Sequence, residues 1–233
     1  MSALLAPAPL QVYFRGDRDG LHLHLPEPAI SWSELWPQVT SRMQSNPLLL
    51  LETQVVTLWA GAWVLDSQRL EAMAALLANY QLPLQRVQTT CRQTAIAAAT
   101  LGYSVEQTPP LAAASTKDAD FATPLYLETT VRSGTAIRHA GTVIVKGDIN
   151  PGGEIVAGGN ILIWGRLRGI AHAGARGWQG AAIAALHFDP TQLRIANRVA
   201  RAPEGKVTFP TPEVAYLQDD TICIASVSEY LRR

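Results

Sequence analysis

A repeat of six residues constrains the fold of this chain more than any other feature of its sequence. Between residues 137 and 167 an aliphatic residue recurs at every sixth position, and a glycine stands two residues before five of the six. The segment GTVIVKGDI (141–149) also aligns with GNILIWGRL (159–167), so a longer period of eighteen residues is present. The aliphatic row is Ile137, Val143, Ile149, Ile155, Ile161 and Leu167, and the glycine row is Gly141, Gly147, Gly153, Gly159 and Gly165.

A period of six inside a period of eighteen is what a three-sided β-solenoid requires. Each face takes a short strand, and each corner takes a tight turn in which glycine tolerates positive φ. One inward apolar side chain per face then stacks on its neighbour in the next coil. An antiparallel sheet would alternate at a period of two without the eighteen-residue alignment. The sequence therefore predicts an all-β C-terminal domain folded as a right-handed triangular β-helix.

The repeat weakens after Gly169. The segment AHAGARGWQGA predicts an irregular corner, and strands resume loosely in AAIAALHF and QLRIANRVA. The tail from Lys206 to Ile224 contains a strand-like TICIAS. We expect this tail to cap the end of the solenoid, which would otherwise expose a sheet edge.

The first hundred residues alternate between strand-like and helix-like segments. Ser31 with Glu34 has the spacing of a capping box, and Asp66 is the predicted N-cap of a second helix, with a third helix in RQTAIAAATLGY. This alternation predicts an α/β N-terminal domain with a mixed sheet. The predicted strands are Leu10 to Arg15, Leu21 to Leu25, Gln54 to Trp59 and Leu84 to Thr89.

The segment between these two patterns is rich in proline and small residues and has no period. It predicts a flexible linker over residues 104–125. The expected organisation is an N-terminal domain over residues 1–103 and a C-terminal domain over residues 126–233.

The net charge and its distribution along the chain limit the kinds of partner that the protein can bind. The 19 basic and 19 acidic side chains give a net charge of zero, and charged residues make up only 16% of the chain. This balance argues against disorder and against nucleic-acid binding driven by overall charge. Residues 126–203, however, carry nine Lys or Arg against four Asp or Glu. Arginine suits bidentate capture of carboxylates, so local recognition of an acidic protein and a solvated charged face both stay open, and no nucleic-acid binding is expected.

Sequence motifs for enzymatic chemistry are sparse. No Walker A, HExxH, GxSxG or CxxC motif occurs, and Cys91 and Cys223 have no metal-ligand spacing, so no cofactor or metal is predicted. His22 and His24 share one strand face but lack a further ligand. The enzymatic alternative is a hexapeptide-like β-solenoid acyltransferase with His139 or His172 as general base. In that family the apolar residue precedes the glycine, whereas here the glycine comes first.

Targeting signals are also missing from the sequence. The N-terminal segment has no basic region typical of a secretory signal. The apolar stretch from Leu48 to Leu65 is interrupted by Glu52, Gln54 and Gly61 and is too short for a membrane span. We therefore expect a cytoplasmic protein.

The second half of the chain resembles a known family. The segments RSGTAIRHAGTVIVKGDINPGGEIVAGGNILIWGRLRGIAHAGA (132–175), PTQLRIANRVAR (190–201) and PEVAYL (212–217) are similar to the C-terminal domain of MinC, the septum-site-determining division inhibitors. FRGDRDGLHLHL (14–25) is similar to the opening of the MinC N-terminal domain.

This resemblance implies a non-enzymatic division regulator. In the family, the N-terminal domain antagonises assembly of the tubulin-like protein FtsZ, and the C-terminal β-helix dimerises and binds the membrane-associated ATPase MinD. The family's MinD-contact motif corresponds to Arg132, Ser133 and Gly134, followed by Thr135 where the family often has Gln. Its contact with the acidic FtsZ tail falls on Arg168, and an acidic residue that some members use nearby is Gly158 here.

The resemblance also implies contact with the membrane only indirectly, through MinD. The outward positions Ile144, Leu162 and Trp164 predict an apolar face that would be covered in a homodimer. Another alternative left open by the repeat is a structural β-solenoid scaffold of the bactofilin kind.

Overall fold

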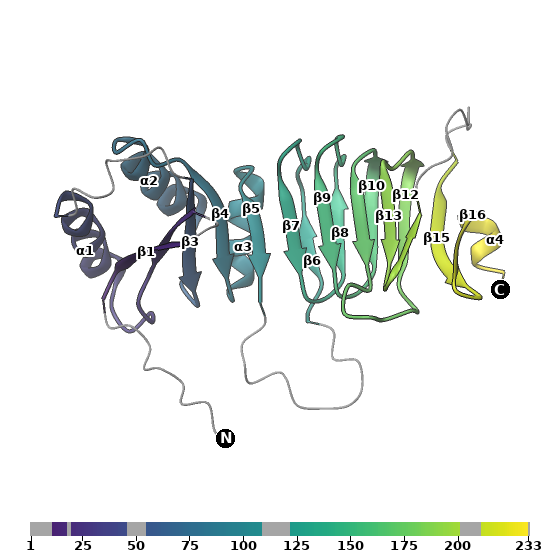
Figure 1. Cartoon of the computed structure of the whole chain (residues 1–233), viewed down its shortest axis with the longest axis horizontal. Helices are drawn as coiled ribbons and strands as arrows, with labels where there is room; N and C mark the ends of the chain where they lie inside the picture. Colours follow the sequence, from purple (N-terminus) through teal and green to yellow (C-terminus); the bar gives the residue numbers. More distant parts are fainter. Residues whose placement is uncertain (1–10, 18–19, 46–54, 109–121, 201–210, 233) are drawn as a thin grey trace, which may run out of the picture. The chain divides into compact units, whose positions relative to one another are not determined.

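The computed structural model describes residues 11–17, 20–45, 55–108, 122–200 and 211–232 (Figure 1). The chain divides into two compact units, Met1–Ala98 (unit 1) and Ala99–Arg233 (unit 2). The centre of the expected linker (109–121), the start of the strand predicted at Leu10 and the first part of the predicted cap (206–210) lie outside the described residues.

Unit 1 is built on strands separated along the chain by helices. β1 (Tyr13–Asp17) pairs antiparallel with β2 (Gly20–His24), while β3 (Val56–Gly61) pairs parallel with β2, and β4 (Leu84–Thr89) pairs parallel with β3. The helices are α1 (Trp32–Gln44), between β2 and β3 in sequence, α2 (Ser67–Ala78), between β3 and β4, and α3 (Arg92–Thr100), after β4.

The helices α1 and α2 cover one face of this sheet. Both connect neighbouring parallel strands in the same direction across the sheet, and such crossovers are right-handed, so both helices lie on the same side. Their apolar stripes are buried together with alternate strand residues. The buried set includes Leu23, Leu58, Leu35, Val39, Met43, Leu70, Met73 and Leu77.

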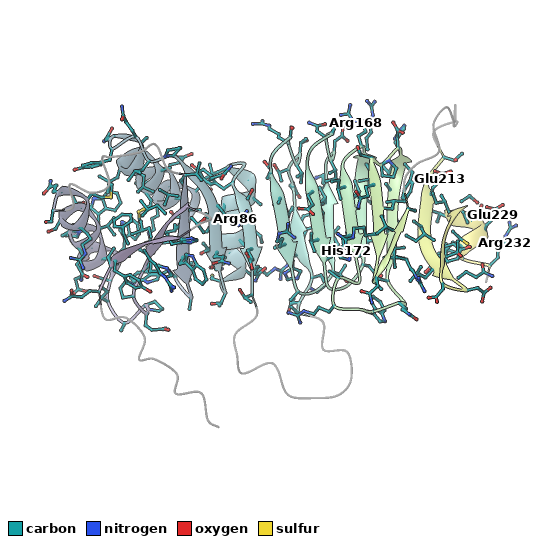
Figure 2. All side chains as sticks on the ribbon, viewed as in Figure 1. Arg86, Arg168, His172, Glu213, Glu229 and Arg232 are labelled. Atoms are coloured by element: carbon teal, nitrogen blue, oxygen red, sulfur yellow. The ribbon has the colours of Figure 1, made fainter. Side chains whose placement is uncertain are left out.

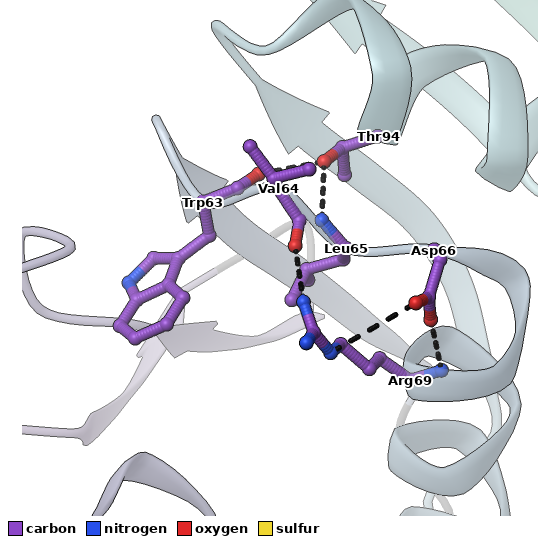
Figure 3. A network of polar contacts seen from close by, with 6 residues as sticks. All are labelled: Trp63, Val64, Leu65, Asp66, Arg69 and Thr94. Atoms are coloured by element: carbon purple, nitrogen blue, oxygen red, sulfur yellow. Dashed lines mark hydrogen bonds and ion pairs between the residues drawn. The ribbon is translucent and has the colours of Figure 1, made fainter. Parts of the chain in front are cut away.

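Local signals fix where the helices begin. The backbone N–H of Ser31 donates to Glu34 Oε2 at 2.8 Å, and Asp66 Oδ1 accepts from the backbone N–H of Arg69 at 2.9 Å. Figure 3 shows how the Asp66 turn is held: Arg69 Nη1 donates to the carbonyl of Val64 at 3.0 Å. In the same view, the hydroxyl of Thr94 accepts from the Leu65 N–H at 2.8 Å and donates to the carbonyl of Trp63 at 2.6 Å. Both predicted helix starts are confirmed.

Unit 2 contains two sheets in which most strands run parallel (Figure 1). The first consists of β6 (Leu125–Leu127), β8 (Val143–Lys146), β10 (Ile161–Leu167), β12 (Ala182–Phe188), β15 (Glu213–Gln218) and β16 (Thr221–Ser226), after which α4 (Val227–Tyr230) follows. The second consists of β5 (Ser104–Gln107), β7 (Ala136–His139), β9 (Glu154–Ala157), β11 (Ile170–Ala173), β13 (Gln192–Ile195) and β14 (Arg198–Ala200). The last strands of each sheet in chain order, β15 and β16 in one and β14 in the other, pair antiparallel, so both sheets are mixed.

The register of unit 2 follows the eighteen-residue period. Val143 pairs with Ile161 in the first sheet, and Ile137 pairs with Ile155 in the second. A third row of parallel bridges joins Val131 to Ile149 and Ile149 to Leu167. Every member of the predicted aliphatic row is at most 1% exposed, so the inward row is confirmed.

The glycine row has a different physical reason from the one expected. Of its five members only Gly147 has a positive φ, at +153°. The others are needed because neighbouring coils approach closely: a Cβ at Gly165 would collide with the carbonyl oxygen of Gly147, and one at Gly159 would lie 2.6 Å from Thr142 Oγ1. The prediction that glycine serves positive φ at every corner is therefore wrong.

Two element predictions in unit 2 are also corrected. Residues 104–107, expected in the linker, form β5, where Val105 is buried and pairs with Ile137. The prolines that follow this segment made it resemble a linker, although its valine extends the inward row. The repeat also continues through β11, and the irregular corner begins at Gly174, which has a φ of +61°.

None of the helices in the described parts of the chain has the length and apolar character that a membrane span requires.

Candidate functional site

Three polar residues stack at one corner of unit 2. Parallel bridges join Val131 to Ile149 and Ile149 to Leu167. The residues that follow them in the chain, Arg132, Asn150 and Arg168, are therefore stacked in successive coils. The backbone N–H of Asn150 donates to the carbonyl of Val131 at 2.9 Å, and that of Arg168 donates to the carbonyl of Ile149 at 2.8 Å. We call the row Arg132, Asn150 and Arg168 the corner ridge.

The predicted MinD-contact residues form the turn at the base of the ridge. Arg132, Ser133 and Gly134 are exposed, and Gly134 has a φ of +78°, which permits the tight turn. The Gly134 N–H donates to the carbonyl of Gly152 at 2.9 Å, and the Thr135 N–H closes the turn on the carbonyl of Arg132 at 3.1 Å. The turn is thus held by the backbone, and its first three residues face solvent.

Thr135 differs from its three neighbours. Its side chain is only 9% exposed, and its hydroxyl donates to the carbonyl of Gly102 at 3.4 Å. Thr135 lies two residues before the inward Ile137, and alternate residues of a strand share one face. Because Ile137 is predicted to face inward, the alternation of side chains along a strand already predicts that Thr135 is buried. The structure brings three of the four predicted residues to the surface and turns the fourth inward.

Arg168 lies at the opposite end of the ridge, in the turn after β10 (Figure 2). Its Nη2 donates to Asn150 Oδ1 at 2.6 Å and lies 3.9 Å from Asp148 Oδ2. Its buried Nε has no hydrogen-bond partner among the described residues. A long, partly exposed ion pair of this kind contributes little stability. The guanidinium is therefore positioned by Asn150, and because the side chain is 40% exposed, its outer nitrogens can donate to a carboxylate.

Gly158 lies at a different corner of unit 2, in the turn between β9 and β10, where its backbone N–H donates to the carbonyl of His139 at 2.9 Å. It is buried, and a Cβ there would collide with the carbonyl oxygen of Ala140. A side chain at this position therefore has no space on this backbone, and Asp148, whose Oδ2 lies 3.9 Å from Arg168 Nη2, is a carboxylate beside the corner ridge.

The predicted apolar positions lie together on the outer face of the first sheet. Leu162 pairs with Ile144 in register, and Trp164 follows two residues later on the same face of β10. Leu162 is 40% exposed and Trp164 is 75% exposed. Two further members were not predicted, Tyr126 on β6 and Leu186 on β12. Tyr126 stands eighteen residues before Ile144, so the repeat itself contained the signal. We call Tyr126, Ile144, Leu162, Trp164 and Leu186 the apolar face.

The two solenoid histidines do not form a common site. His139 is buried on the inner side of the second sheet, with Nε2 3.1 Å from the carbonyl oxygen of Thr123. His172 lies on the outer side, with Nε2 3.0 Å from the carbonyl oxygen of Ala196, and burial is the main cause that lowers its pKa. Since each ring is held by a backbone carbonyl, the geometry favours structural roles over an acyl-transfer base.

His22 and His24 lie on one strand face of unit 1, as expected. His22 Nδ1 accepts from Trp59 Nε1 at 2.9 Å, and the ring of His24 stacks on Trp59. Over the described ranges, no group of three or more His, Cys, Asp or Glu side chains is arranged to hold a metal ion. Their neighbour Trp59 was not expected, because the sequence does not state that β3 pairs with β2.

Comparison with known proteins identifies the family. The model for the C-terminal domain of the septum formation inhibitor MinC matches residues 125–227. A probable septum site-determining protein MinC from Gloeobacter violaceus is 49% identical over 237 residues, which span 100% of this chain and 85% of that protein. The chain belongs to the MinC family. This membership confirms the resemblance found in the sequence, and extends it through the N-terminal half.

Other MinC proteins show the same relationship. A probable septum site-determining protein MinC from Nostoc sp. is 47% identical over 90% of this chain and 58% of that protein. Among solved structures, the MinC:MinD cell division protein complex of Aquifex aeolicus matches with a TM-score of 0.44 and 35% identity, over 48% of this chain and 94% of that chain.

Proposed function

We propose that this chain inhibits cell division at misplaced septa by antagonising the assembly of FtsZ polymers. The observation that carries the proposal is identity of 49% with a probable septum site-determining protein along the whole chain. Inhibition would proceed by stoichiometric contact, without bond chemistry or a cofactor, since the histidines with catalytic potential are held by backbone carbonyls.

Unit 2, in this proposal, is a right-handed triangular β-helix, and the N-terminal part is an α/β domain. Three rows of parallel pairing at a spacing of eighteen residues support the first assignment. Parallel strands separated by α1 and α2 support the second. Because β5 pairs with β7, we place the start of the C-terminal domain at β5 rather than at residue 126.

MinD binds, in our proposal, at the turn formed by Arg132, Ser133 and Gly134. These residues are exposed on a turn that backbone hydrogen bonds hold in place, so little backbone ordering accompanies binding. Thr135 supports the turn from below and does not contact the partner. Attachment to MinD would bring a cytoplasmic protein to the membrane surface and would raise its local concentration at FtsZ.

The apolar face supports a two-fold homodimer. Its exposed Trp164 and Leu162 stand in adjacent outward positions of β10, which is typical of an association surface. The ion pair between Lys146 Nζ and Glu128 Oε2, 3.5 Å apart, borders the face with charge. Arg168, whose side chain is 40% exposed, is the proposed contact for the acidic tail of FtsZ.

The test of MinD recruitment uses the full chain with MinD, ATP and anionic lipid vesicles. Arg132→Ala should lower the amount that co-sediments by about tenfold or more, because truncating one partner of a buried charge pair at an interface costs a few kcal/mol. Arg176→Ala, which removes an exposed arginine of the same unit, is the matched control and should bind as the wild type does. Unchanged binding of Arg132→Ala would contradict the proposed site.

The test of inhibition is light scattering by FtsZ with GTP in the presence of the full chain. We expect lower scattering in proportion to the inhibitor added, and a chain that leaves assembly unchanged would refute the function. Sedimentation of Trp164→Glu as a monomer, beside a dimeric wild type, would support the dimer face.

A further inference from the structure

Unit 1 leaves one face of its sheet without a covering helix among the described residues. The antiparallel pairing of β1 with β2 and the parallel pairings of β2, β3 and β4 align side chains into two columns on this face. The helices α1 and α2 occupy the other side. The columns are Arg15, His22, Thr57 and Arg86, and Tyr13, His24, Trp59 and Gln88, and we call these eight residues the open face.

The aromatic rings of the second column stand with their planes perpendicular to the sheet. The ring centroids of Tyr13 and His24 lie 4.5 Å apart at an interplanar angle of 4°, and those of His24 and Trp59 lie 4.9 Å apart at 23°. These separations are close to the distance between neighbouring strands, about 4.7–4.9 Å. The rings are therefore stacked across the strands, and they present their edges to solvent. Ring edges carry partial positive charge, which attracts anions.

Positive charge lies beside this aromatic stack, in the first column. Arg15 and Arg86 are exposed in the first column, and Figure 2 shows Arg86 on β4. None of the eight side chains of the open face is a carboxylate. Burial lowers the pKa of His24, and the nearby charges of His22 and Arg15 lower it further. The open face is thus electropositive, and an anion placed on it would relieve the repulsion among these groups.

We propose that the open face is the surface through which the N-terminal unit contacts FtsZ, and that FtsZ presents an acidic segment to it. This inference rests on the proposed function and adds the surface and the chemistry of the contact. Arg15 and Arg86 pair with carboxylates at the two borders, and the edges of His24 and Trp59 contact the segment between them. A polymer that carries many copies of such a segment offers many equivalent docking sites.

Two other occupants are disfavoured by the same geometry. Single-stranded nucleic acid binds aromatic surfaces by stacking bases on exposed ring faces. Here both faces of the His24 ring are already covered by Tyr13 and Trp59. A second copy of the open face would bring arginines against arginines, which is repulsive.

Proton uptake provides an additional signature of this contact. The groups that face His24 are Tyr13 and Arg15 on β1, His22 on its own strand and Trp59 on β3, with Arg86 beyond on β4. A docked carboxylate favours the protonated form of His24, so docking takes up a proton. By linkage, binding should tighten as the pH falls through the ordinary range of histidine.

The experiment measures binding of the full-length chain to FtsZ polymers by co-sedimentation. Arg86→Glu and Arg15→Glu should each weaken binding by about tenfold or more, because each replaces an attractive pair with repulsion. The matched control is Arg92→Glu, the same charge change at the exposed first residue of α3, and should alter binding by less than about twofold. Circular dichroism verifies that each variant is folded.

The outcomes separate the inference from the proposed function. A wild-type chain that does not bind FtsZ overturns both. A wild-type chain that binds, with Arg86→Glu and Arg15→Glu binding equally well, overturns the open face alone. Binding of a fluorescent single-stranded oligonucleotide, or self-association of the chain, that disappears in Arg86→Glu while FtsZ binding persists would also overturn it. His24→Phe, which retains a ring for the stack, should reduce the gain in affinity between about pH 7.5 and pH 6.

Discussion

The two units bury their sheets by different means. Unit 1 covers one face of the β1–β4 sheet with α1 and α2, and each helix begins at a local signal such as Asp66. Unit 2 buries rows of its own aliphatic residues, and each strand is positioned by a similar strand eighteen residues away. Stability in unit 1 is thus divided among separate local elements and one packed face. In unit 2 it depends on register, so a disturbance in one coil reaches its neighbours directly.

Among the substitutions that test this difference, Ile155→Ala should change the free energy of unfolding most. Ile155 is 0% exposed and pairs with Ile137 in β7 and Ala171 in β11. Its truncation leaves a cavity in the stacked row and should lower the free energy of unfolding of unit 2 by about 2–5 kcal/mol. The neighbouring outward Val156→Ala should cost at most about 1 kcal/mol.

Urea denaturation with hydrogen exchange by mass spectrometry would measure both Ile155→Ala and Val156→Ala. Faster exchange in β7, β9 and β11 together is expected for Ile155→Ala, since these strands share the row. Loss of protection confined to β9 would show that the coils are not coupled.

A smaller effect is expected for Gly165→Ala. A Cβ at this position collides with the carbonyl oxygen of Gly147 in the coil below, so the substitution should destabilise unit 2 by about 1–3 kcal/mol. In unit 1, a Cβ added at Gly16 would have no other atom within 4 Å. Gly16→Ala is therefore the control and should change stability by no more than about 0.5 kcal/mol. Equal thermal midpoints for the two variants would contradict the close approach of coils.

The smallest expected effect is the pH dependence of the free energy of unfolding of unit 1. The pKa of His24 lies below its ordinary value near 6.5, so the unfolded chain binds the proton more readily than the folded one. The free energy of unfolding of unit 1 should be fully retained above that value and should fall as the pH decreases through it. His24→Gln should flatten this dependence, as measured by chemical denaturation at about pH 7.5 and pH 5.5. Burial also lowers the pKa of His172 in unit 2, although the Ala196 carbonyl opposes this effect, so a dependence of the same sign is expected there.

The sequence predicted the inward row of unit 2 and the helix starts of unit 1 because both depend on short-range patterns. Ile137 to Leu167 follow one period, and Asp66 caps the helix next to it. The role of the glycines was misjudged, since the separation of coils is a tertiary quantity that no single coil reveals. The burial of Thr135 follows from its parity with Ile137, which is a short-range pattern, whereas the family motif contains no information on exposure.

The open face shows what the sequence does not contain. His22 and His24 were expected on one strand face, yet their surroundings depend on which strands lie beside β2. Tyr13 and Trp59 reach them only through the order of β1, β2 and β3. The order of strands in unit 1 is set by the crossover direction of the helices, whereas in unit 2 a column such as Tyr126, Ile144 and Leu162 follows from spacing alone.

The bridges that join Val131, Ile149 and Leu167 imply that unit 2 can lengthen only by whole coils of eighteen residues. Inserting eighteen residues between two coils would add one rung to the corner ridge and one to the apolar face, and every side chain would keep its face. Inserting six or twelve would move all later residues around the axis to another side, separating Arg132 from Arg168. Variation in length among such chains should therefore occur in whole coils or in the turns, and the distance between the two arginines of the ridge should change only in steps of one strand spacing, about 4.8 Å.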